Sequence, residues 1–176
     1  MAPGGVPGVS SPAVAHSILI LLHAGLAVAS FVLGCVLLAA LPDSARSPRF
    51  AAFFWCTVAA MACLLAVVLL DWPGLPTTKR IAFAVLAALA VYLMVRAVQA
   101  WRALVRKPDR WRRSFIGHVG FVMISLFDGF CIVAAIDLGM PPPVTITIAV
   151  LGVVVGILLL RVLVRRDAAR HPAQAS

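Results

Sequence analysis

The chain has 176 residues, of which 63% are hydrophobic and only 12% are charged, and its formal net charge is +9. Soluble domains carry roughly 45–50% apolar and about 25% charged residues, and so short a chain could not bury this apolar excess in water. The composition therefore excludes an ordinary soluble domain. In a membrane protein, the positive charge is explained by basic residues that set the topology and contact anionic lipids, rather than by binding of nucleic acid.

Five apolar runs follow one another along the chain, separated by connections rich in Pro and Gly. Each run reaches the roughly 20 residues that a helix needs to cross a hydrocarbon core of about 30 Å. The runs are continuous rather than alternating, which predicts helices and not barrel strands. We therefore expect an all-α bundle of five transmembrane helices, at about residues 14–41, 50–70, 81–101, 115–138 and 144–164. This transmembrane domain covers 14–166, between disordered tails at 1–13 and 167–176.

The basic residues lie mainly on alternate connections. Two lie in the first connection, six in the third and four at the C-terminal end, whereas the opposite side has only Lys79 and Arg80. Basic residues mark the cytoplasmic side, which predicts an outside N-terminus and a cytoplasmic C-terminus. The Ala-, Val- and Arg-rich composition, without Glu, is typical of a GC-rich bacterium. We expect a multi-pass protein of the bacterial inner (cytoplasmic) membrane that contacts anionic lipids on its cytoplasmic side.

Two polar stripes cross the third and fourth spans at helical spacing: Tyr92, Arg96 and Gln99, and His118, Ser125 and Asp128. Ionisable groups at membrane depth cost at least about 2–3 kcal/mol on insertion scales, so each is a functional candidate. Because the two helices are consecutive and antiparallel, we expect their stripes to face each other. The site then consists of Asp128, Arg96, Tyr92, Ser125 and His118, either as a polar cavity with a proton- or ligand-sensitive carboxylate or as a buried polar hairpin that fixes packing. Arg96 could also extend to the inner headgroups.

His16 and His23 share one face of the first span and, with His118, are the candidate ligands for haem b. Their depths disagree, because His23 lies about 13 Å and His118 about 30 Å from the outer ends of their helices. A haem would then need another ligand or a homodimer. No cofactor and no metal site is predicted. Nor is a catalytic residue, since HExxH, Walker A and GxSxG motifs are all missing.

The fifth span contains Gly152 and Gly156 in GxxxG spacing, which allows two helix backbones to approach closely. Packing within the chain and homodimerisation are equally compatible with this motif. The leading hypothesis is a non-catalytic structural or accessory membrane component, bound to a second copy or to another membrane protein. The alternatives are a small transporter or proton-coupled protein that uses the polar site, and a haem-binding electron-transfer protein.

Overall fold

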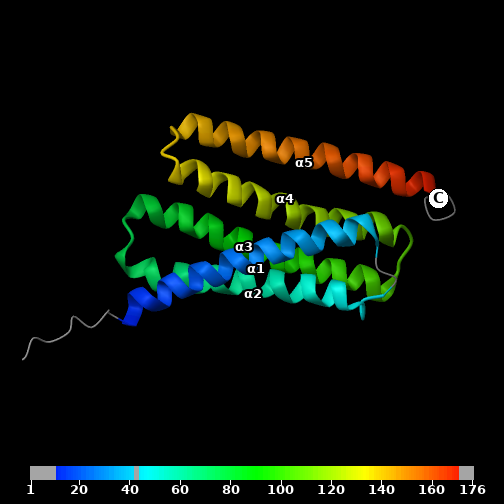
Figure 1. The fold of residues 1–176 in the computed structure, drawn as a ribbon, viewed down its shortest axis with the longest axis horizontal. Coiled ribbons are helices and arrows are strands. Elements are labelled where there is room, and N and C mark those ends of the chain that lie inside the picture. Colours follow the sequence, from blue (N-terminus) through cyan, green and yellow to red (C-terminus); the bar gives the residue numbers. More distant parts are fainter. Residues whose placement is uncertain (1–10, 42–43, 171–176) are drawn as a thin grey trace, which may run out of the picture.

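The structure, a computed structural model, describes residues 11–41 and 44–170 (Figure 1). Within these ranges it consists of helices without strands: α1 Ser11–Ala39, α2 Pro48–Asp71, the 3-10 turn η1 Trp72–Gly74, α3 Thr77–Arg106, α4 Trp111–Asp137 and α5 Pro142–Arg170. All five α-helices are long and apolar enough to span a membrane. The predicted all-helical architecture with five candidate spans is confirmed.

Most helix ends extend beyond the apolar runs from which they were predicted, although α1 ends at Ala39 rather than at 41 and α4 at Asp137 rather than at 138. α3 continues from the expected end at 101 to Arg106, and α5 continues from 164 to Arg170. Ala, Leu and Arg are strong helix formers, so a helix need not end where its apolar run ends. Residues 11–13 and 167–170, both predicted as parts of disordered tails, are helical, and the tail predictions are wrong there. The predicted tail residues 1–10 and 171–176 lie outside the described residues.

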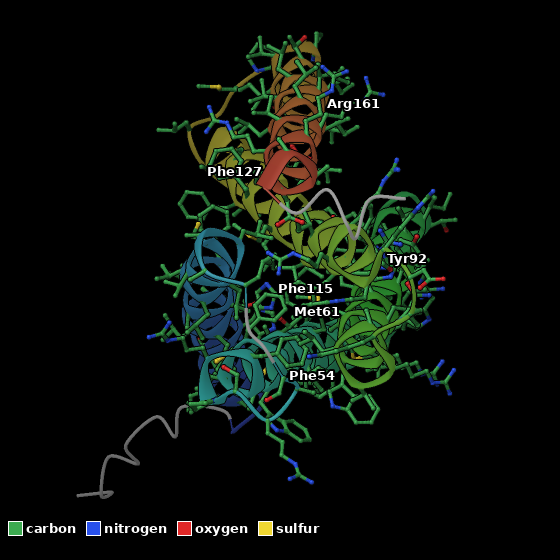
Figure 2. All side chains as sticks on the ribbon, turned by 90° about the vertical axis from the view of Figure 1, so that its right-hand side faces the viewer. Phe54, Met61, Tyr92, Phe115, Phe127 and Arg161 are labelled. Carbon is green, nitrogen blue, oxygen red and sulfur yellow. The ribbon has the colours of Figure 1, made fainter. Side chains whose placement is uncertain are left out.

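Helices α1 to α4 form a closed ring, in which α1 contacts α2 and α4 while α3 contacts α2 and α4. α5 lies outside this ring and packs mainly on α4, as the view along the bundle shows (Figure 2). The densest part of the core is at the end where α2 and α4 begin. There the rings of Phe50 and Phe115 are 5.7 Å apart, and Phe50, Phe53, Phe115 and Leu37 are at most 1% exposed.

Polar contacts join α1 to α2 within their candidate membrane spans. The Ser30 and Thr57 hydroxyls are buried and 2.6 Å apart, and Thr57 donates its hydrogen to the Phe53 carbonyl. Ser30 is therefore the donor to Thr57. Seven residues before Ser30 in α1, His23 Nδ1 lies 2.8 Å from the Ala60 carbonyl oxygen and donates to it. Interhelical hydrogen bonds of this kind satisfy polar groups where lipid offers no partner.

The α4–α5 hairpin is closely packed because a glycine on one helix lies opposite a larger residue on the other. A Cβ atom on Gly152 would lie 2.7 Å from Asp128 Oδ1, and one on Gly156 would lie 2.5 Å from Ile124 Cγ1. Conversely, Leu160 packs against Gly120. These three pairs lie 12, 16 and 20 residues on either side of Met140, so the register is constant along the hairpin. The GxxxG glycines thus face α4 of the same chain.

Candidate functional site

Arg96 lies between α3 and α4, surrounded by aromatic rings and backbone. Its Nη2 atom donates to the Gly117 carbonyl at 3.3 Å, and its guanidinium carbon lies 5.0 Å from the ring centre of Phe121 and 5.8 Å from that of Tyr92. The two rings meet edge to face at 5.2 Å. Tyr92 lies on the outer side of α3, away from α1 (Figure 2). Cation–π contacts stabilise a guanidinium at this depth but do not neutralise its charge.

An open hollow of about 430 Å³ lies beside Arg96, at the end of the hairpin where α3 finishes and α4 begins. We call it the α3–α4 hollow. Its lining includes the side chains of Arg96, Asp109, Arg110, Arg113, Ser114 and His118. Three guanidinium groups and one carboxylate therefore surround the same space, which makes it a positively charged recess rather than a neutral one.

Two buried nitrogen atoms beside the α3–α4 hollow have no hydrogen-bond partner in the described part of the chain: Arg96 Nε and His118 Nδ1. The other ring nitrogen of His118 lies 3.1 Å from the Ser114 hydroxyl. An unpaired buried polar atom is costly, because it has lost water without gaining another partner. The recess therefore combines a net positive charge with unused hydrogen-bonding capacity.

Asp128 lies away from this recess, on the side of α4 that faces α5. Its Oδ1 atom is buried beside Gly152 and lacks a hydrogen-bond partner. Across the α3–α4 hairpin, Arg96 meets Gly117 and Tyr92 meets Phe121. This register places Asp128 level with Val85, about 16 Å along the axis from Arg96 at 1.5 Å per residue. No ion pair joins Asp128 to Arg96 among the described residues.

The structure therefore brings together three of the five predicted site residues. Arg96, Tyr92 and His118 lie at one end of the α3–α4 hairpin, and Asp128 belongs to the α4–α5 contact. Ser125, three residues before Asp128, is half-buried. The third polar residue of the α3 stripe, Gln99, has a buried and unpaired Oε1 atom.

The candidate haem ligands are found in three separate environments. His16 Nδ1 lies 3.1 Å from the Asp71 carboxylate at the start of α1 and the end of α2, an ion pair when the imidazole is protonated. His23 is bonded to the Ala60 carbonyl, and His118 borders the α3–α4 hollow. Within the described ranges, no group of three or more His, Cys, Asp and Glu side chains is placed to hold a metal ion.

Sequence reasoning missed a strong contact between α4 and α5. Arg112 holds Asp167 through Nε and Nη2, with distances of 2.8 to 3.1 Å. Both side chains are about four-fifths buried. The sequence contained a clue to this contact, because Arg112 and Asp167 lie at nearly equal numbers of residues from Met140, like the glycine pairs. Arg112 is therefore engaged on the α5 side, while its neighbour Arg113 faces the α3–α4 hollow.

No family model, curated protein or solved structure matches this chain. Its function is accordingly inferred from its own residues.

Proposed function

We propose that this protein is a non-catalytic structural or accessory component of a bacterial cytoplasmic membrane, with its N-terminus outside and its C-terminus in the cytoplasm. The observation that carries the proposal is the position of α5. This 29-residue helix packs mainly on one neighbour, and its remaining faces present exposed apolar side chains such as Leu151, Val154 and Leu158. A helix held on one side only has most of its surface available to another membrane helix.

The polar contacts support a structural role rather than a reaction. Four polar side chains of α1 and α2 bond to each other or to backbone, or pair with Asp71, and Arg112 is paired with Asp167; the four are His16, His23, Ser30 and Thr57. Such contacts fix helix packing in lipid. Asp128, the most unusual residue of the sequence, is likewise enclosed between α4 and α5 beside Gly152.

Site-specific photo-crosslinking in native membranes tests the proposal. A crosslinking amino acid at Val154, on the free side of α5, is compared with one at Val91 on α3, since the two side chains are 46% and 47% exposed. We expect a discrete adduct at Val154, with either a second copy or another protein, and none at Val91. Equal labelling at both positions, or lipid adducts alone, would contradict an accessory role through α5.

A second candidate function is a small transporter or proton-coupled protein that uses the polar groups of α3 and α4. The α3–α4 hollow, with the unpaired nitrogen atoms of Arg96 and His118, favours this alternative. Solute or proton flux into proteoliposomes, abolished in Arg96→Gln but retained in Arg102→Gln, is the result that would establish it. The haem hypothesis has a simpler test, because bound haem gives a Soret absorption band in the purified protein.

A further inference from the structure

We propose that the α3–α4 hollow binds the phosphate group of an anionic phospholipid. The proposal does not depend on the accessory role of α5. The predicted orientation enters only in assigning the lipid to the inner leaflet.

The first argument is uncompensated charge. Arg96 lies within a candidate membrane-spanning helix, and among the described residues it contacts one carbonyl oxygen and two aromatic rings but no carboxylate. Arg110 and Arg113 line the same recess, which contains a single acidic side chain, Asp109. Arg112 provides the internal comparison, because its charge is matched by Asp167. The Arg96 guanidinium therefore lacks the matching carboxylate that Arg112 has, and an anion bound in the recess would supply that charge.

The second argument is hydrogen-bonding geometry. A phosphate group presents several strong acceptor oxygens, and guanidinium groups are the donors that match it best. The recess offers Arg96 Nε without a partner, and His118 Nδ1 can also donate. The α4 helix begins at Trp111, so the positive end of its dipole also points toward this space.

The third argument concerns depth and favours a lipid over a soluble phosphate. Trp101, a residue type that prefers the headgroup layer, is 45% exposed, and Arg96 lies about 8 Å deeper along α3. The recess thus extends from the headgroup layer into the membrane. Beyond Arg96, the exposed Tyr92 ring and the half-buried Phe121 ring continue the surface as an aromatic wall. An acyl chain can pack on this wall, whereas inorganic phosphate has no apolar group that could do so.

The test is native mass spectrometry of the delipidated full-length protein in a neutral detergent. Dioleoyl phosphatidylglycerol, which carries a net negative charge, is titrated against zwitterionic dioleoyl phosphatidylcholine. We expect one phosphatidylglycerol per chain, bound at least tenfold more tightly than phosphatidylcholine. Arg96→Gln should weaken this binding at least tenfold, and Arg113→Gln about fivefold. The matched control, Arg102→Gln, removes an exposed arginine of the same helix end that does not line the recess and should stay within twofold of wild type.

Arg113 is exposed, so Arg113→Gln keeps the test valid even if Arg96→Gln disturbs helix packing. Equal affinity for the two lipids would overturn the proposal, and so would equal weakening by Arg113→Gln and Arg102→Gln, which would indicate diffuse surface attraction. In a parallel experiment, the binding of inorganic phosphate is measured in the same way. If it binds as tightly as phosphatidylglycerol and displaces it, the recess is a site for soluble phosphate and the lipid assignment is wrong.

Discussion

At the scale of single residues, the structure places Asp128 in the contact between α4 and α5. Its carboxyl group lies close to Gly152, because a Cβ atom on that glycine would be 2.7 Å from Oδ1. We expect Asp128→Asn to fold normally, because the amide has nearly the same shape and carries no charge. Asp128→Lys should reduce folded protein sharply, because it adds length beside Gly152 and places a charge at membrane depth, at a cost of about 2.5–3.5 kcal/mol. The yield of monodisperse protein on detergent size-exclusion chromatography measures both effects, and equal yields would show that the site is open.

The Arg112–Asp167 pair leads to a second prediction at this scale. Each charge lies at the helix end that the backbone dipole disfavours, with Arg112 at the start of α4 and Asp167 near the end of α5. Asp167→Asn should lower stability by about 1–2 kcal/mol, because it leaves a largely buried guanidinium without its carboxylate. That loss corresponds to about 2–7 °C in the midpoint of thermal unfolding for a chain of this size.

The exchanged double variant, Arg112→Asp with Asp167→Arg, is the control for this pair. It keeps the ion pair and the net charge while it places each charge at the favourable helix end. Its midpoint should therefore return to the wild-type value or exceed it. A double variant as unstable as Asp167→Asn would mean that packing of the side chains, and not their charges, holds the two helix ends together.

At the scale of elements, the α4–α5 contact depends on glycines at particular positions. Gly156→Ala places a Cβ atom 2.5 Å from Ile124 Cγ1, so the Ile124 side chain or α5 must shift, at a cost of about 1–3 kcal/mol. Gly129 lies in α4 with no atom within 4 Å of a built Cβ, so Gly129→Ala should leave stability unchanged or raise it through helix propensity. Thermal midpoints of the two variants in one detergent compare these effects directly. The same loss in both would contradict a specific contact between α4 and α5.

The five helices could be predicted from the sequence because each is a continuous apolar run, a signal that needs no knowledge of neighbours. The pairing of polar residues could not be predicted equally well. Two stripes on adjacent helices show which faces are polar, but the register between those faces depends on side-chain packing. In the α3–α4 hairpin this register separates Arg96 from Asp128. In the α4–α5 hairpin, residues equally distant from Met140 meet, and small residues opposite large ones were the available clue.

Sequence reasoning identified Arg96 and His118 because ionisable groups within apolar spans are rare. It did not foresee the contacts of Ser30 with Thr57 or of His23 with the Ala60 carbonyl. Ser and Thr are common in membrane helices, and a backbone acceptor has no sequence signature. These contacts became visible only once the neighbouring helix was placed.

At the scale of the whole molecule, the orientation in the membrane links the two proposals. The α3–α4 connection and the helix ends beside it carry six of the fifteen basic residues, whereas Lys79 and Arg80 lie at the opposite end of α3, where Arg80 Nη2 contacts the Pro73 carbonyl at 3.5 Å. We expect a C-terminal green fluorescent protein fusion to be fluorescent, since this protein folds in the cytoplasm. Alkaline phosphatase, which needs an oxidising compartment, should be active when fused after Gly74 and inactive when fused after Pro108.

The control for this orientation removes the charges of Lys79 and Arg80, the two basic residues on the predicted outer side. Lys79→Gln with Arg80→Gln should leave every reporter unchanged, because basic residues outside the cytoplasm do not set the preferred orientation. Active phosphatase after Pro108 would place the end of α3 and the α3–α4 hollow at the outer surface. The phosphate site would then face the opposite leaflet, and the C-terminal end of α5 could not meet a cytoplasmic partner. The reporter experiment therefore decides in which leaflet each proposed contact is to be sought.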